Sequence, residues 1–268
     1  MIDIHCHILP GIDDGPVEES ESLEMARLAV EDGITDIICT PHHLPGLYPT
    51  SPDRIHAAVS SLQDSLDAAN IALTLHPGME VHISAADPDL VHQGKLLGLN
   101  RQGNALLVEF PHQFVPPYAD SLFWSFITSR IRPVLAHVER YPALLADPSP
   151  LTDWARMGVI HQITASSLLG RFGPEVVDFA WQLIEHNLAH VVATDAHSAD
   201  FRRPHMHEAA QEIQDRFGLQ TSQDMTQNMP LTLLQGLSID LPDPLPFAEE
   251  RYDSSSIIRR LLGWVVNR

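Results

Sequence analysis

Short runs rich in isoleucine, leucine and valine alternate with longer amphipathic stretches along most of this chain. Short apolar runs are typical of buried strands, whereas apolar residues spaced three and four apart are typical of helices. The predicted strands are residues 1–5, 34–40, 71–81, 104–110, 132–139, 158–164 and 189–197. The predicted helices are residues 17–33, 51–70, 87–95, 121–130, 174–187 and 205–218.

The helix predicted at residues 51–70 carries the clearest boundary signals. Ser51 is a good N-cap residue, and Pro52 suits the first helical position, where no N–H is needed. The apolar positions of this stretch recur on one face, which predicts that the helix packs against a core. Those positions are Ile55, Val59, Leu62 and Leu66.

The regular alternation of strands and helices predicts a parallel β/α architecture, either a barrel or an open doubly wound sheet. No internal repeat or low-complexity linker divides residues 1–240, so we expect a single domain there. Residues 241–268 are expected to form a tail that begins proline-rich and ends in the basic, apolar segment 257–268. That segment either docks on the domain or contacts a partner or a membrane surface.

Composition narrows the functional classes. The 268 residues carry a formal net charge of −19, which argues against a basic nucleic-acid-binding surface. The sequence has no apolar run long enough for a transmembrane helix, and its first residues lack the pattern of a signal peptide. Two cysteines, Cys6 and Cys39, give no disulfide framework and fit a reducing compartment, so we expect a cytoplasmic protein. Its oligomeric state stays open.

Metal-ligating side chains recur where the predicted strands end. Histidine is frequent, with 16 of 268 residues. The carboxyl ends of the strands in a β/α barrel build its active site, so we expect these side chains to converge. They are His5, His7, His42, His43, Glu80, Glu109, His137, Glu139, Asp195 and His197, with Asp13 and Asp14 in the turn after the first strand.

We interpret this set as a polynuclear metal site. Each residue alone has an ordinary structural explanation, since a buried glutamate can pair with an arginine and an aspartate can cap a turn. The mixture of imidazole and carboxylate groups suits Mn²⁺, Fe or Zn²⁺, and no cysteine cluster favours structural zinc. The set exceeds what one ion needs, so we expect two or three ions that share bridging ligands.

The order of these motifs resembles the polymerase-and-histidinol-phosphatase (PHP) superfamily of metal-dependent phosphoesterases. Within it, the chain is similar to the bacterial manganese-dependent tyrosine-protein phosphatases of capsule and exopolysaccharide systems, over about residues 1–237. The resemblance rests on MIDIHCHILPGIDDG, CTPHHLPGLY, VEFPHQFVPPYAD, AHVERY, QITASSLLGRFG, ATDAHSADFRRPHMHEA and MTQNMPLTLLQG.

The resemblance implies a distorted (β/α)7 barrel of the PHP type, with the metal site at the C-terminal ends of the strands. It implies two or three divalent ions, Mn²⁺ first and Fe or Zn²⁺ as alternatives. Asp13 would then form or support the turn, and His43 is a candidate substrate contact. One ion would take His5, His7, Glu80 and Asp195; a second would share Glu80 and add Glu109 and His137; a third would take Asp14, His42 and His197.

Arg140 and Arg202 match the phosphate-binding arginines of the resembling family, whose planar guanidinium groups suit phosphate. Alternatively, either arginine only forms an ion pair in an acidic cleft. The implied activity is hydrolysis of phosphotyrosine, by water activated between metal ions. The implied partner is the phosphotyrosyl tail of a membrane-associated bacterial tyrosine autokinase, which would hold the protein at the inner face of the membrane.

Two other functions stay open. A small-molecule phosphomonoesterase of the histidinol-phosphate type would use the same ligands. A non-catalytic metal-binding adaptor of the kinase would keep the metals without turnover, and the complete ligand set argues against it. A cysteine nucleophile with an arginine six residues later is excluded, because those positions hold Ile12 and Pro45.

Overall fold

The computed structural model describes residues 1–245, so the segment 257–268 lies outside the described residues. The strands are β1 (Ile2–Cys6), β2 (Asp36–Cys39), β3 (His42–His43), β4 (Thr74–Pro77), β5 (Glu80–His82), β6 (Ala105–Glu109), β7 (Arg132–Leu135), β8 (Ile160–Thr164) and β9 (Val191–Ala193). The α-helices are α1 (Glu19–Glu31), α2 (Pro52–Ala68), α3 (Pro88–His92), α4 (Ala119–Thr128), α5 (Pro142–Ala146), α6 (Ser149–Met157), α7 (Ala165–Leu168), α8 (Pro174–Glu185), α9 (His207–Phe217), α10 (Leu219–Gln223) and α11 (Met229–Gln235). Two short 3-10 helices, η1 (Ile83–Ala85) and η2 (Val138–Arg140), and the π-helix η3 (Asp224–Asn228) complete the described elements.

The predicted alternation of strands and helices is confirmed, but two predicted strands are interrupted. The run 34–40 ends as β2, and β3 begins after Pro41; the run 71–81 forms β4 and β5 on either side of Gly78. Proline has no N–H to donate to a ladder. Gly78 lies so close to β2 that an added Cβ would meet Ile38 Cγ2 at 2.6 Å, so only glycine fits there.

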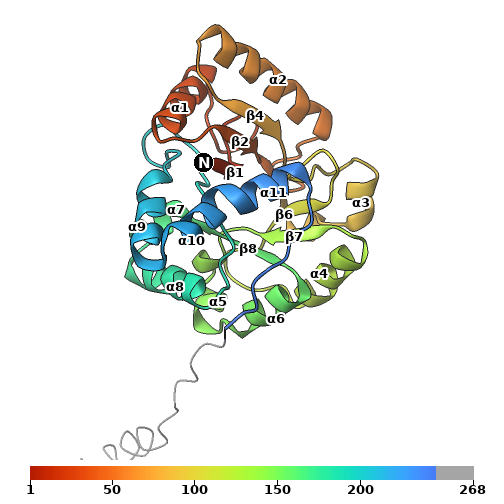
Figure 1. The fold of residues 1–268 in the computed structure, drawn as a ribbon. Coiled ribbons are helices and arrows are strands. Elements are labelled where there is room, and N and C mark those ends of the chain that lie inside the picture. Colours follow the sequence, from red (N-terminus) through yellow and green to blue (C-terminus); the bar gives the residue numbers. More distant parts are fainter. Residues whose placement is uncertain (246–268) are drawn as a thin grey trace, which may run out of the picture.

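The strands form a curled parallel sheet with helices around it (Figure 1). One ladder has the order β1-β2-β4 and the other β3-β5-β6-β7-β8-β9. A bridge between Cys6 and Ala196 brings the end of β9 beside β1, where the Asp195 N–H donates to the His5 carbonyl at 2.8 Å. The class is therefore α/β, and the carboxyl ends of all these strands face the same way.

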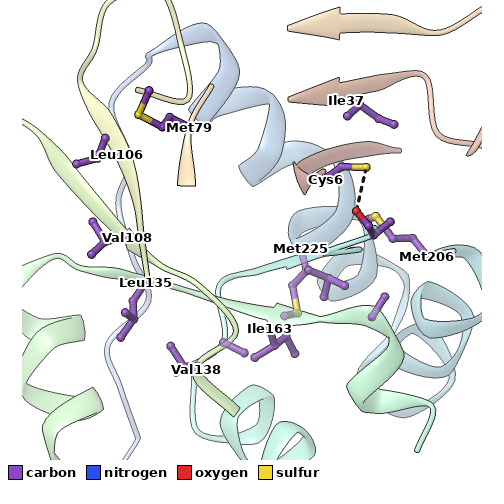
Figure 2. Close-up of a cluster of buried hydrophobic side chains, with 14 of the residues drawn as sticks. Cys6, Ile37, Met79, Leu106, Val108, Leu135, Val138, Ile163, Met206 and Met225 are labelled. Carbon is purple, nitrogen blue, oxygen red and sulfur yellow. Dashed lines mark hydrogen bonds between the residues drawn. The ribbon is translucent and has the colours of Figure 1, made fainter. Parts of the chain in front are cut away.

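Side chains along each strand point alternately to the two faces of the curled sheet, so two apolar layers form. The outward layer packs against the helices and includes Leu106 and Val108 of β6 (Figure 2). The inward layer contains Ala105 and Leu107 of the same strand, and Leu233 of α11 packs in that layer. Because side chains alternate with period two, Glu109 shares the inward face with Leu107. β9 repeats this pattern with Val191, Ala193 and then Asp195.

Helix boundaries follow the predicted signals. The Ser51 hydroxyl accepts the Arg54 N–H at 3.4 Å, and Pro52 occupies the first turn of α2. The four predicted apolar positions of this helix are all buried. Within residues 1–245, none of the helices combines the length and the apolar character that a membrane span requires.

A pair of buried histidines, His161 of β8 and His190 before β9, lies outside the strand-end cluster. Their ring centroids are 5.2 Å apart. His161 Nδ1 donates to the Leu188 carbonyl at 2.9 Å, and His190 Nδ1 accepts the backbone N–H of His161 at 2.9 Å. Burial lowers the pKa of His161 to about 4, and burial together with His161 lowers the pKa of His190. Both rings are therefore uncharged at neutral pH.

Acid should destabilise the fold through these histidines. The unfolded chain binds their protons near pH 6.5, whereas the fold resists protonation until lower pH, so stability is lost as pH falls from about 6.5 to 4. Denaturant titrations with a chelator present measure the free energy of unfolding against pH. His161→Gln should reduce the slope of this dependence by the equivalent of up to about one bound proton. His56→Gln, at an exposed position of α2, should not change the slope. Equal slopes for wild type and His161→Gln would contradict the assignment.

Candidate metal centre

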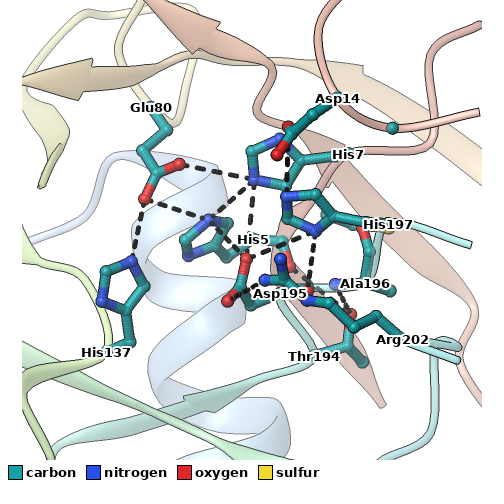
Figure 3. Close-up of polar contacts among 12 residues, drawn as sticks. His5, His7, Asp14, Glu80, His137, Thr194, Asp195, Ala196, His197 and Arg202 are labelled. Atoms are coloured by element: carbon teal, nitrogen blue, oxygen red, sulfur yellow. Dashed lines mark hydrogen bonds and ion pairs between the residues drawn. The ribbon is translucent and has the colours of Figure 1, made fainter. Parts of the chain in front are cut away.

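His5 of β1 and His7, directly after β1, have Nε2 atoms that lie 3.2 Å apart (Figure 3). Both side chains are fully buried. His5 Nδ1 donates to Gln162 Oε1 at 2.9 Å, and His7 Nδ1 donates to Asp13 Oδ2 at 2.7 Å. Because each Nδ1 carries the proton of its hydrogen bond, each Nε2 lone pair faces the cluster and can bind a metal.

Glu80, the first residue of β5, lies at the centre of the cluster. Its Oε1 is 3.3 Å from Nε2 of both His5 and His137. Its Oε2 is 2.8 Å from His42 Nδ1 and 3.4 Å from His7 Nε2. One carboxylate thus lies close to four histidines from three separate segments of the chain, which is the arrangement of a bridging ligand.

The surroundings of Glu80 fit divalent cations. Burial alone would raise the pKa of this carboxyl, but His5 and His42 hold it well below its usual range, so the group is ionised. Among residues 1–245, no N–H or O–H group forms a hydrogen bond to either oxygen of the Glu80 carboxylate. A buried carboxylate without donors is costly unless cations compensate it. Metal ions between this carboxylate and the surrounding imidazoles would supply that compensation.

Three groups of ligand atoms lie close enough to hold an ion, with all atoms of a group within 4.8 Å of one another. Asp14 joins one of them, since its Oδ1 is 3.5 Å from His42 Nε2 and 3.4 Å from His197 Nε2. The groups are His7, Asp14, His42 and His197; His5, His7 and Glu80; and His42, Glu80 and Glu109.

The structure brings all nine expected ligands into one cluster, with two differences from the expected grouping. His7 lies with His5 and Glu80, as expected, but also with the residues expected for the third ion. His42 lies 3.6 Å from Glu109 Oε2, beside the expected second site. His137 lies 3.3 Å from Glu80 and 3.6 Å from Glu109, as the expected second site requires. Which ion each residue takes stays a prediction.

Asp195 links the cluster to both candidate phosphate-binding arginines. Its Oδ1 is 3.4 Å from His5 Nε2 and 3.6 Å from His7 Nε2. Its Oδ2 forms ion pairs with Arg140 Nη1 and Arg202 Nη2. Two guanidinium groups therefore lie at one edge of the cluster, held by a carboxylate that also faces its centre.

Two of the candidate ligands have left-handed backbones, which non-glycine residues adopt rarely. His137 after β7 has φ 36° and Asp195 after β9 has φ 50°. Such conformations cost energy and persist at functional sites when surrounding bonds enforce them. Here the N–H of His137 donates to Gln162 Oε1 at 3.1 Å, and that of Asp195 donates to the His5 carbonyl.

Asp13 and His43 form hydrogen bonds to the backbone of segments beside the cluster. Asp13 accepts from His7 Nδ1, from the His42 N–H at 2.9 Å and from the Gly15 N–H at 3.0 Å, so it holds the turn and orients a ligand. His43 Nδ1 donates to the Thr50 carbonyl at 2.9 Å. Its ring is therefore tied to the neighbouring loop.

Two further residues, which were not predicted from the sequence pattern, orient candidate ligands or the strands that hold them. Gln162 accepts from both His5 and His137 through one oxygen, and two-residue alternation from Ile160 could have placed it on the inward face. Asp3 accepts the Thr194 N–H at 3.0 Å and the Thr194 hydroxyl at 2.5 Å, which ties β1 to β9. Glu139, a strand-end candidate, instead accepts from Thr164 and Ser167.

The cysteines lie away from the polar cluster. Cys6 packs in the outward apolar layer, where its thiol contacts the Ala196 carbonyl at 3.9 Å (Figure 2). Burial raises the pKa of both Cys6 and Cys39. Neither thiol is therefore poised as a nucleophile, in agreement with the sequence.

A parallel α/β fold that gathers histidines and carboxylates at its strand ends is the architecture of a metal-dependent hydrolase. The family model described as "Capsular polysaccharide synthesis, CpsB/CapC" matches residues 1–235, and the chain belongs to this family. It is 39% identical to the tyrosine-protein phosphatase YwqE of Bacillus subtilis, over 92% of this chain and 96% of that protein. It is 31% identical to the tyrosine-protein phosphatase CpsB of Streptococcus agalactiae, over 81% and 91% respectively.

Solved structures agree with this assignment. The chain superposes with a TM-score of 0.88 on a structure from work titled "Crystal structures of YwqE from Bacillus subtilis and CpsB from Streptococcus pneumoniae, unique metal-dependent tyrosine phosphatases". That match has 37% identity and covers 93% of this chain and 100% of the other. A β-aspartyl dipeptidase from Fervidobacterium islandicum, at 14% identity and TM-score 0.53 over 88% of this chain and 72% of its own, shares only the fold.

Removing Gln162 Oε1, which accepts hydrogen bonds from both His5 and His137, should weaken metal binding. Gln162→Leu frees the rings of His5 and His137, and loss of such an orienting bond typically costs about 10- to 100-fold in metal affinity. Calorimetric titration of metal-stripped protein with Mn²⁺ measures this directly. Gln227→Leu, at an exposed position, serves as the matched control. Unchanged Mn²⁺ affinity in a natively folded Gln162→Leu protein would contradict the role given to Gln162.

Metal binding should release protons. Burial and Arg140 oppose protonation of His137, yet Glu109 and Glu80 raise its pKa to about 9, so the metal-free site holds protons at neutral pH. Metal must displace them, so Mn²⁺ affinity should rise from about pH 6 to pH 9. Calorimetry in buffers of different ionisation enthalpy counts the protons. Affinity independent of pH, with no buffer dependence of the heat, would show that the imidazoles are not ligands.

Proposed function

We propose that this chain is a metal-dependent protein-tyrosine phosphatase that serves capsule or exopolysaccharide synthesis. The observation that carries the proposal is the histidine–carboxylate cluster around Glu80, with Arg140 and Arg202 on its edge. The match to YwqE along nearly the whole chain supports phosphotyrosine as the substrate.

Two or three divalent ions are proposed for the cluster, Mn²⁺ first and Fe or Zn²⁺ as alternatives. The donor set of imidazoles and carboxylates supports this choice. Such ions, when bound, supply Lewis acidity that activates water and positive charge that offsets the phosphate. The proposed ligands are His5, His7, Asp14, His42, Glu80, Glu109, His137, Asp195 and His197.

Arg140 and Arg202 are proposed to hold the phosphate oxygens. Their guanidinium groups share Asp195 Oδ2, so both are positioned before substrate arrives. Planar N–H groups bind phosphate oxygens in pairs and stabilise the charge that develops on them during transfer. The leaving phenolate is a stable anion, so the reaction places little demand on a general acid.

The fold is proposed to be a distorted seven-strand β/α barrel within a domain of residues 1–240. β2 with β3, and β4 with β5, then count as two interrupted strands. The hydrogen bonds between the end of β9 and β1 support closure of the ring. The interruptions place His42 and Glu80 in short segments beyond the main strands, which brings both toward the cluster.

The proposed substrate segment is the phosphotyrosyl tail of a membrane-associated tyrosine autokinase of the polysaccharide system. The description of the matching family, capsular polysaccharide synthesis, supports this partner. Because such a kinase uses ATP on the cytoplasmic side, we propose that the phosphatase acts in the cytoplasm, at the inner face of the membrane.

Side-by-side kinetics test the proposal. The Mn²⁺-loaded protein should hydrolyse a phosphotyrosyl peptide with higher kcat/KM than histidinol phosphate. Higher efficiency on histidinol phosphate would instead assign a small-molecule phosphomonoesterase. Absence of turnover on both, with metal bound, would indicate a non-catalytic adaptor.

Arg140→Lys keeps the positive charge but removes the planar guanidinium group with its paired N–H donors. We expect kcat for the peptide to fall by about 10²- to 10³-fold, as when one transition-state donor is lost, while Mn²⁺ affinity changes little. Arg130→Lys, on the surface after α4, should match wild type. Full activity in Arg140→Lys would remove this residue from the phosphate site.

A further inference from the structure

A groove of about 850 Å³ adjoins the metal centre. Arg140 lines this groove and also contacts Asp195 in the cluster, so the groove begins where the phosphate would lie. The guanidinium carbon of Arg140 is 4.5 Å from the centre of the Phe172 ring, which forms part of the same wall. α5 and α8 border the groove, and both lie on the same side of the fold (Figure 1).

One face of α8 gives the groove its charge. Glu175, Asp178 and Gln182 are spaced three and four residues apart, line the groove and are exposed. Such spacing places them on one side of the helix. Phe179, between them, is buried and supplies an apolar floor. Among the described residues that line the groove, only Arg140 and His112 are basic, so the groove runs from a guanidinium to carboxylates.

We infer that this groove binds the peptide segment that flanks the phosphotyrosine, and that Glu175 and Asp178 select substrates with lysine or arginine there. The inference rests on the proposed function, because it takes the phosphate to be bound at Arg140. It names the class of substrate sequence that the site prefers.

Charge and shape both support this occupant. Opposite charges across a contact raise association rates and suppress wrong partners, and the protein carries a net charge of −19. Lysine and arginine also have long apolar stems, which pack well against apolar surface while the charged end reaches a carboxylate. Phe172, Phe179 and Pro142 offer such a surface along the groove. Since each exposed ion pair contributes little, the expected preference is about 2- to 10-fold in kcat/KM.

Three phosphotyrosyl peptides that differ only in their flanking residues test the inference. With the Mn²⁺-loaded protein at low ionic strength, kcat/KM should fall in the order lysine, alanine, glutamate flanks. The Glu175→Gln, Asp178→Asn double variant should lose this order, and so should wild type in high salt. Glu185→Gln, on the same helix but outside the groove lining, should keep it.

Hydrolysis of an aryl phosphate that carries no peptide measures the catalytic step without any contact in the groove. Its kcat/KM should be the same in wild type and in the double variant, because Glu175 and Asp178 do not belong to the proposed metal and phosphate site. Equal kcat/KM for lysine- and alanine-flanked peptides in wild type would overturn the inference and leave the proposed function standing. A preference that survives in the double variant would also overturn it. If histidinol phosphate is the better substrate and no peptide is hydrolysed, the proposed function itself fails.

Discussion

A buried, ionised carboxylate surrounded by imidazoles is the constraint on which this site depends. Glu80 lies at the centre of the cluster, within 3.4 Å of ring nitrogens from four histidines. An ionised group cannot stay away from water without compensating positive charge. Side chains from β1, β3, β5 and β6 and from the segments after β7 and β9 meet in one cluster, and the interruption between β4 and β5 places this carboxylate there.

Hydrogen bonds at Nδ1 orient the rings of His5 and His7. Gln162 and Asp13 accept the outer ring protons of His5 and His7, and each also accepts a backbone N–H of a further ligand residue. One acceptor thus orients a ring and fixes a neighbouring strand end. Although burial lowers the pKa of His7, Asp13 and Glu80 raise it well above its usual value. Protons and metal ions therefore compete for the same nitrogen atoms, which connects affinity to pH.

The candidate ligands could be predicted because each follows an apolar strand, a signal that depends only on local sequence. Two-residue alternation from Leu107 to Glu109 is an example. Pro77-Gly78 is a turn signal within the run 71–81, but the close approach of Gly78 to Ile38 of another strand exists only in the folded chain. The sequence also shows no sign of α5 and α10, each too short to show a helical period. The double ion pair of Asp195 with Arg140 and Arg202 depends on loops that meet only in the folded chain.

The proposed role of Glu80 is to bridge metal ions in one shared cluster. A crystal structure of the Mn²⁺-loaded protein, with anomalous scattering recorded at the manganese edge, tests it most directly. We expect at least two manganese peaks in contact with the Glu80 carboxylate, each also in contact with histidines of the cluster. A single peak, or peaks that do not contact Glu80, would contradict it.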